Sequence, residues 1–199
     1  RAVVLFIAAA IGFTACGDGE GDSTSSSTTN RTHTQTNTQN RVGQETKNGA
    51  IGLKITKVTS SPTLIYQGGN QTEVTPNGIK RIVHAPQGGR YVLVQAVVTN
   101  DSHAGIDISC GLPVQAKAFD DKGRQFDSDQ NLFLIAGNPE CNVNVQPGFK
   151  HKVTWPFLVP PGTKVTTFSY SDQTALSNAN AATVTIEERP PTQITIPPI

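Results

Sequence analysis

The amino-acid sequence predicts an all-β fold, an antiparallel β-sandwich of roughly seven to nine strands with one disulfide, preceded by a disordered tether. From Ala50 onward, short apolar runs are separated by Gly, Pro, Asn and Asp, which is typical of strands joined by turns. No stretch of this region has the apolar spacing of a long amphipathic helix. The sandwich is therefore expected over residues 50–188.

The apolar pattern places the individual strands. Long strands are expected at 51–58, 90–99, 114–119, 124–126, 149–157, 165–170 and 182–187. Shorter strands are expected at 63–66, 79–84, 105–108, 132–135 and 142–145. The turn at 120–123, with the sequence DDKG, indicates a β-hairpin between two of these runs.

Alternation within the strands indicates which side chains face the core. Ile51, Leu53 and Ile55 share one face and are expected to be buried. Residues 90–99 are apolar on both faces, which predicts a central strand. The apolar face of the strand at 149–157 is expected to carry Phe149, Val153, Trp155 and Phe157.

Composition argues against a nucleic-acid-binding protein. The chain of 199 residues has a formal net charge of +1. Its Lys and Arg residues are scattered, and the longest basic run is the pair at 80–81. Binding to nucleic acid requires a clustered basic face.

The first segment has the features of an export signal. Residues 2–15 form an apolar run of about fourteen residues, shorter than the roughly 20 that a transmembrane helix needs. The residues FTAC at 13–16 resemble the lipobox of bacterial lipoproteins, in which the cysteine is lipidated on sulfur and becomes the N-terminus. Residues 1–16 are therefore expected to be a lipoprotein signal peptide and lipobox, with Cys16 as the anchor. The alternative is an ordinary secretory signal cleaved near Ala15.

The cysteine count supports this interpretation. Three cysteines are an odd number for an exported chain. With Cys16 assigned to a lipid, Cys110 and Cys141 remain, and a disulfide between them would stabilise the fold by roughly 3–4 kcal/mol. The alternative is two buried free thiols.

Both ends of the expected sandwich have a different composition. Residues 17–49 are rich in Ser, Thr, Asn and Gln and lack hydrophobic periodicity, so they are expected to form a disordered tether. The Pro-rich tail at 189–199 is expected to be extended along a sheet edge or disordered.

Several landmarks follow one another in a characteristic order. They are GRYVLV at 89–94, VTN at 98–100, FDDKGRQF at 119–126, PG at 147–148 and FLVP at 157–160. Together they resemble the telokin-like, immunoglobulin-like domain of secreted lipoproteins from Gram-positive bacteria and actinobacteria. A mycobacterial secreted immunoprotective antigen shares that architecture. The resemblance covers residues 50–188 and implies an immunoglobulin-like fold and an extracytoplasmic location, without a catalytic residue.

No catalytic constellation is evident in the sequence. There is no Gly-x-Ser-x-Gly elbow, and the histidines lack metal-ligand spacing. His151 shares a strand face with Phe149 and Val153 and is expected to be a partly buried structural residue, while His103 is expected in a loop. His84 also lacks a neighbouring residue at metal-ligand spacing. The sequence therefore predicts no enzyme and no cofactor.

The best acidic cluster consists of Asp120, Asp121, Asp127, Asp129 and Asn131. The oxygen-bearing residues at 127, 129 and 131 have the alternation that begins a calcium loop. Leu132 then stands where the turn glycine is needed, and Asn138 where the bidentate Glu is needed. Asp127, Asp129 and Asn131 are therefore only weak metal candidates, and a solvated loop is expected.

These features predict an exported bacterial lipoprotein, held at the membrane by Cys16, whose head binds a protein or cell-envelope partner without catalysis. One alternative is a secreted antigen or prophage-encoded surface protein that modulates host contact or infection. Another is a small-molecule carrier, which would need an apolar cavity between the sheets. An extracytoplasmic enzyme is a further alternative.

Overall fold

The computed structural model describes residues 40–67, 73–75, 78–110, 113–174 and 190–199. The expected signal peptide with Cys16, the tether residues 17–39 and the strand expected at 182–187 lie outside this described part. Within it, every strand pairs antiparallel with its neighbour.

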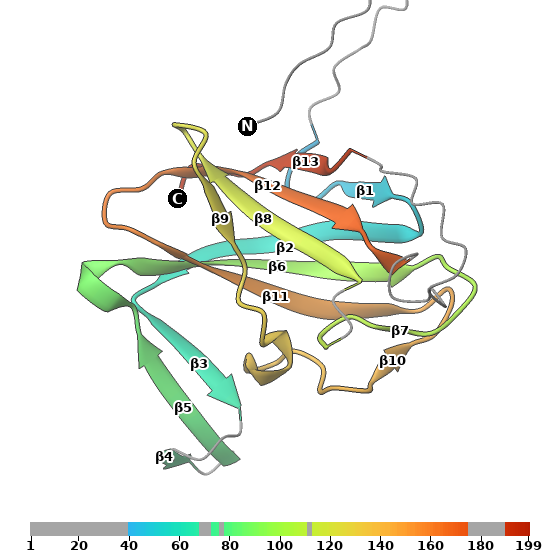
Figure 1. Cartoon of the computed structure of the whole chain (residues 1–199), viewed down its shortest axis with the longest axis horizontal. Helices are drawn as coiled ribbons and strands as arrows, with labels where there is room; N and C mark the ends of the chain where they lie inside the picture. The colour runs from blue at the N-terminus through green and yellow to red at the C-terminus, as the bar shows by residue number, and fades with distance from the viewer. Residues whose placement is uncertain (1–39, 68–72, 76–77, 111–112, 175–189) are drawn as a thin grey trace, which may run out of the picture. The chain divides into compact units, whose positions relative to one another are not determined.

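Eight strands form two four-stranded sheets (Figure 1). The first sheet has the order β1 (Glu45–Asn48), β2 (Ile51–Ser61), β6 (Arg90–Asn100) and β11 (Lys150–Val159). The second has the order β13 (Thr192–Thr195), β12 (Val165–Asp172), β8 (Val114–Asp120) and β9 (Gln125–Asp127). This confirms the antiparallel β-sandwich, with β6 as the expected central strand and β8–β9 as the expected hairpin.

The inner faces of the two sheets meet in an aromatic core. Trp155 from β11 and Phe168 from β12 are fully buried, with ring centroids 5.7 Å apart. Tyr170 stacks on Phe168 at 6.4 Å. The expected inward residues are also fully buried: Ile51, Leu53, Ile55, Trp155 and Phe157. Burial of each such side chain favours folding by about 1.5–3 kcal/mol.

The C-terminal tail closes one side of the sandwich. Strand β13 pairs with β12, so the tail is extended along a sheet edge as expected, and the disordered alternative is wrong for residues 190–199. The Thr192 hydroxyl donates to the Lys47 carbonyl at 3.3 Å, which links β13 to β1 in the opposite sheet. A second contact between the two sheets joins β1 to β12, where the hydroxyls of Thr46 and Tyr170 lie 3.1 Å apart.

A three-stranded sheet, here called the wing, extends from the sandwich (Figure 1). It consists of β3 (Thr63–Gln67), β5 (Gly78–His84) and β4 (Glu73–Thr75), in that order. Leu64 and Tyr66 on β3 pack with Tyr91 and Ile135 in a second, smaller buried cluster. A final pair, β7 (Ile106–Asp107) and β10 (Asn144–Val145), matches the short strands expected near it.

The strand expected at 132–135 is instead the 3-10 helix η2 (Leu132–Leu134). This turn sends Leu132 into the main core and Ile135 into the cluster beneath the wing. An apolar run of four residues does not distinguish a strand from a turn of helix.

Two boundaries also differ from expectation. The tether was expected to continue to residue 49, but strand β1 occupies Glu45–Asn48, where the polar residues Thr46 and Asn48 are buried through hydrogen bonds. Polar composition concealed this strand. Phe149, expected in the core, is 67% exposed because it lies in the turn before β11, where its N–H donates to the Gln146 carbonyl at 3.0 Å.

The side chain of Asn138 pairs with the outer edge of β11 as a neighbouring strand would. Its Nδ2 donates to the Thr154 carbonyl at 2.9 Å, and its Oδ1 accepts from the Thr154 N–H at 2.7 Å. Nδ2 also donates to the Leu132 carbonyl at 2.9 Å. The amide thus satisfies the edge backbone and fixes η2 beside it.

Replacing this amide should destabilise the whole domain. Asn138→Ala is expected to lower the free energy of unfolding by about 2–4 kcal/mol, because it leaves buried backbone groups unpaired. Urea denaturation measures the change. The control Asn144→Ala, at an exposed position of β10, should cost less than about 0.5 kcal/mol. Equal losses in the two variants would contradict the role assigned to Asn138.

Candidate functional site

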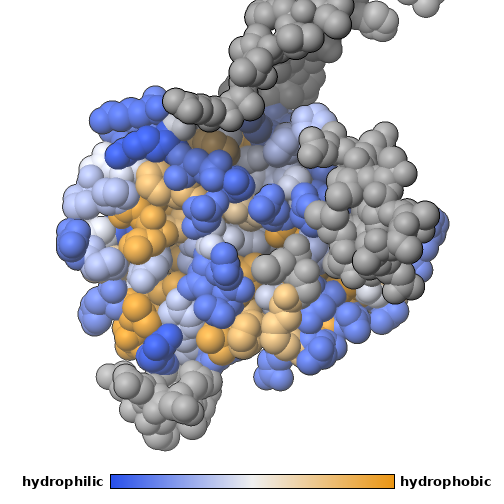
Figure 2. Space-filling view, viewed as in Figure 1, coloured by the Kyte–Doolittle hydropathy of each residue, from blue (hydrophilic) through white to orange (hydrophobic). Residues whose placement is uncertain are grey.

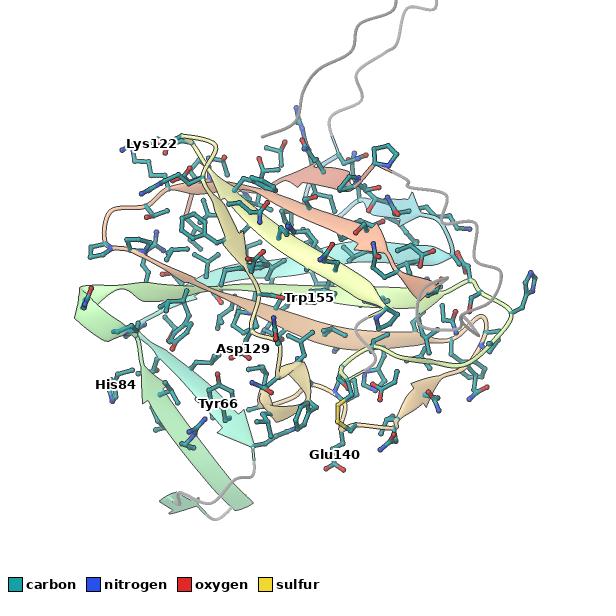
Figure 3. All side chains as sticks on the ribbon, viewed as in Figure 1. Tyr66, His84, Lys122, Asp129, Glu140 and Trp155 are labelled. Atoms are coloured by element: carbon teal, nitrogen blue, oxygen red, sulfur yellow. A yellow bond between two sulfur atoms is a disulfide. The ribbon has the colours of Figure 1, made fainter. Side chains whose placement is uncertain are left out.

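Cys110 and Cys141 form the disulfide that the sequence predicts, with Cα atoms 5.3 Å apart. The alternative of two free thiols is therefore wrong. The Asp107 carboxylate lies beside the bond and accepts from the N–H of Cys110 at 2.9 Å and of Asn142 at 2.7 Å. These donors adjoin both cysteines, so one carboxylate holds the two segments together. Figure 3 shows Glu140 next to the disulfide.

The hydrogen bonds determine the ionisation of Asp107. Burial alone raises its pKa, but the donors from Cys110, Asn142 and Ser109 together lower the pKa below the ordinary aspartate value. The charged form is therefore stabilised in the folded state. Asp107 therefore stabilises this loop by binding the backbone on both sides of the disulfide.

The acidic residues around β8 and β9 have separate partners. Asp120 is buried and binds Arg124 Nε at 2.6 Å. Asp127 is exposed and lies 3.8 Å from Lys117 Nζ. Asp129 accepts from the Tyr66 hydroxyl and from the Asn131 N–H. Among the described residues, no group of three or more His, Cys, Asp or Glu side chains could hold a metal ion.

The three histidines of the described region lie in different places. His84 is exposed at the end of the wing, as Figure 3 shows, and His103 is exposed in the loop after β6. His151 on β11 is partly buried, as expected, and its Nδ1 lies 3.1 Å from the Lys152 carbonyl oxygen.

A tyrosine–aspartate pair joins the wing to the sandwich (Figure 3). The Tyr66 hydroxyl donates to Asp129, and the Arg81 guanidinium lies 4.8 Å from the centroid of the Tyr66 ring. Gln67 adds a second connection, since its Nε2 donates to the carbonyls of Phe133 and Asn138 at 3.2 and 3.1 Å. The sequence analysis missed this connection because its residues are more than sixty positions apart.

An apolar groove lies at the end of the sandwich where β6 begins and β11 ends. Its volume is about 360 Å³. The 3-10 helix η1 (Pro86–Gly88) and Gly89 line one side, residues 158–161 line the other, and Phe126 from β9 completes it. A Cβ on Gly89 would lie 2.9 Å from the Val159 carbonyl oxygen, so only glycine permits this close approach.

Apolar residues also gather on the left side of the molecule in Figure 2, the side on which Figure 1 places the start of β6 and the β11–β12 turn. Leu158 in the groove lining is 43% exposed. The carrier alternative required an apolar cavity between the sheets, where Trp155, Phe168 and Tyr170 pack together. The concave apolar surface lies at the end of the sandwich instead.

Two arginines lie near this end of the sandwich, where both contact Thr163. Arg90 donates to Ser60 Oγ at 2.7 Å and to the Thr163 carbonyl at 2.6 Å, so both acceptors are neutral. Arg124 also reaches Thr163, at 3.3 Å, and lies 5.8 Å from the Phe126 ring centroid. Segments 86–90, 119–126 and 158–165 together hold four Lys or Arg residues and two Asp residues, a net formal charge of +2.

The sequence analysis did not find this groove. Its lining comes from three segments that are each unremarkable turns or strand ends. Only the fold brings their prolines, Phe126 and Leu158 together, so no local pattern could have indicated the site.

No family model matches the chain, and no curated protein matches it. The chain is similar to a solved uncharacterised β-sandwich protein from Clostridium difficile, at 12% identity and a TM-score of 0.45, over 67% of this chain and 88% of that one. A conserved hypothetical protein from Bacillus anthracis is similar at 10% identity and a TM-score of 0.45, over 68% and 90%. The yjhA protein from Bacillus subtilis is similar at 12% identity and a TM-score of 0.47, over 80% and 100%. The fold assignment rests on the strand pairing described above.

All three tyrosines should resist ionisation in the folded protein. Burial raises the pKa of Tyr66, Tyr91 and Tyr170 above the ordinary value of 10.0, and Asp129 raises the first two further. Tyrosinate absorbance should therefore appear near pH 10 only in denaturant. The free energy of unfolding should fall as the pH rises above about 10, because the unfolded phenols ionise first. A phenol that titrates reversibly near pH 10 in the folded protein would contradict this assignment.

Asp107→Asn should weaken the domain in a pH-dependent way. At neutral pH the free energy of unfolding is expected to fall by about 1–3 kcal/mol, because charge-assisted hydrogen bonds are lost. The deficit should narrow as the pH falls below 3.8 and through the lower folded-state pKa, where wild-type Asp107 also becomes neutral. Asp121→Asn, in the exposed β8–β9 turn, is the matched control. Urea denaturation of wild type and variant at neutral pH and at a pH below 3.8 measures the difference in free energy of unfolding. A difference that does not vary with pH would refute the role of the charge.

Proposed function

We propose that the chain is an exported bacterial lipoprotein, anchored to the cell membrane by a lipid on Cys16, whose β-sandwich head is a non-catalytic binding module. Its partners are proteins or components of the cell envelope. The observation that carries this proposal is the Cys110–Cys141 disulfide.

The disulfide supports both the location outside the cytoplasm and the lipid anchor on Cys16. Structural disulfides persist in oxidising compartments, outside the cytoplasm. Because the two cysteines of the head are bonded to each other, Cys16 is the one cysteine of the chain outside that bond. It follows an apolar run and a small residue, which is the setting of a lipidated cysteine. In the described part of the chain, no helix is long and apolar enough to cross a bilayer.

Two features of the head support a binding role. The groove offers a concave apolar surface, the commonest form of a ligand site. Asp107, Asp120 and Asp129 each accept hydrogen bonds that hold a loop or the wing in place. These contacts give the three carboxylates structural roles. They therefore favour a head that binds its partner through its surface over one that uses these carboxylates in catalysis.

The proposal includes a relation to the telokin-like domain of secreted lipoproteins, which the landmarks at 89–94 and 119–126 suggest. The alternatives remain a freely secreted antigen, a prophage-encoded surface protein, a small-molecule carrier and an extracytoplasmic enzyme.

The anchor can be tested by intact mass. The chain is expressed in a Gram-positive host from its own gene, and the membrane fraction is analysed for wild type and Cys16→Ser. Wild-type protein is expected in the membrane with a mass increment of diacylglycerol size. The variant is expected to lose that increment and to appear in the medium.

Ser25→Ala, in the Ser- and Thr-rich segment after the cysteine, is the matched control and should behave as wild type. Unmodified protein in the medium for both wild type and Cys16→Ser would overturn the anchor and favour a secreted protein.

A further inference from the structure

We propose that the groove at the end of the sandwich binds the alkyl chain of a free anionic amphiphile of the fatty-acid class, with its carboxylate held by Arg90 and Arg124. This inference rests on the proposed function only in that the head is a binding module. It does not depend on the anchor.

Seven of the eight residues that line the groove are apolar or glycine, which matches a ligand body that makes few hydrogen bonds, and the eighth, Gln87, carries an amide. The prolines at 86, 160 and 161 have no N–H group. The Gly89 N–H already donates to the Pro86 carbonyl at 2.9 Å, and Val159 is paired with Arg90 in the sheet. A peptide or a sugar would leave its own polar groups unpaired against these walls, which is costly. An alkyl chain has no such groups.

The size of the groove suits one chain. Its volume of about 360 Å³ lies at the low end of the roughly 300–1,000 Å³ that small-molecule sites occupy. Leu158 lies in the lining and is 43% exposed in the absence of a ligand. Covering this side chain would remove apolar surface from water and so favour binding.

The cations set the sign of the headgroup. A guanidinium has five N–H donors. Arg90 donates to Ser60 and Thr163, and Arg124 donates to Asp120 and Thr163. Both side chains therefore keep donors for a ligand. Arg124 is paired with Asp120, whereas the acceptors of Arg90 among the described residues, Ser60 and Thr163, are neutral, so no carboxylate in that part of the chain offsets the Arg90 charge. Arg124 also lies against the ring of Phe126 in the groove lining.

Titration calorimetry of the full-length chain tests the ligand class. The probes are laurate, below its micelle concentration, and dodecyltrimethylammonium, which has the same chain and the opposite charge. Laurate is expected to bind at least about tenfold more tightly, because charge-assisted hydrogen bonds hold its carboxylate. Hexanoate should bind more weakly than laurate, because it buries less apolar surface.

Two variants locate the site, each with a matched control. Leu158→Glu places a charge in the groove and is expected to weaken laurate binding by about tenfold or more. Phe149→Glu makes the same kind of change at an exposed position that does not line the groove, and should leave binding unchanged. Arg90→Gln should weaken laurate but not dodecyltrimethylammonium, and Lys152→Gln is its control.

Amide chemical shifts provide a measurement that does not depend on any variant folding. Laurate added to ¹⁵N-labelled wild type should shift the resonances of Gln87, Gly89 and Leu158 and leave that of Phe149 in place. Equal affinity for the two charged probes, or shifts that avoid the groove, would overturn the proposal. Binding to anionic phosphatidylglycerol vesicles without binding to laurate would also overturn it, since it would indicate a membrane surface as the partner.

The outcome is separable from that of the anchor experiment. If Cys16 is lipidated but the wild-type protein does not bind laurate, the proposed ligand is refuted and the proposed anchored binding module stands. Laurate binding by a protein that carries no lipid would refute the anchor and keep the ligand.

Discussion

The packing of β11 against β12 is the constraint on which the other parts of the structure depend. Trp155 and Phe168 meet at its centre, and both are fully buried. The indole Nε1 of Trp155 has no hydrogen-bond partner within the described residues. Truncation of a buried Trp costs about 3–5 kcal/mol, so this packing is a major contribution to stability.

Strand β11 also organises what lies outside the core. Its outer edge binds Asn138 and the Asp129 backbone, which fixes η2 and, through Tyr66 and Gln67, the wing. Its C-terminal end carries Leu158 into the groove lining. The groove, the wing and the core therefore share one strand, and a shift of β11 would move all three.

The carboxylates of this protein act mainly on its own loops. Asp107 accepts from both cysteine segments, Asp120 organises the β8–β9 turn with Arg124, and Asp129 binds the wing. Each accepts hydrogen bonds from its own loop or from a neighbouring segment, which explains why an alternating acidic pattern in sequence does not converge on a common point. Arg90 beside the groove differs, because its acceptors in the described part of the chain are the neutral Ser60 and Thr163.

The sequence by itself determined most of the strand positions, the two-sheet class, the β8–β9 hairpin and the disulfide pair. These follow from a period of two in apolar residues, from turn chemistry, and from the parity of three cysteines. Tertiary structure decided the rest. It recruited the polar segment 45–48 as a strand, turned residues 132–134 into a 3-10 helix between two cores, and joined Tyr66 to Asp129. It also assembled the groove from three distant segments. The physical reason is that these features depend on contacts between residues far apart in the chain, and local pattern carries no information about which distant surfaces will meet.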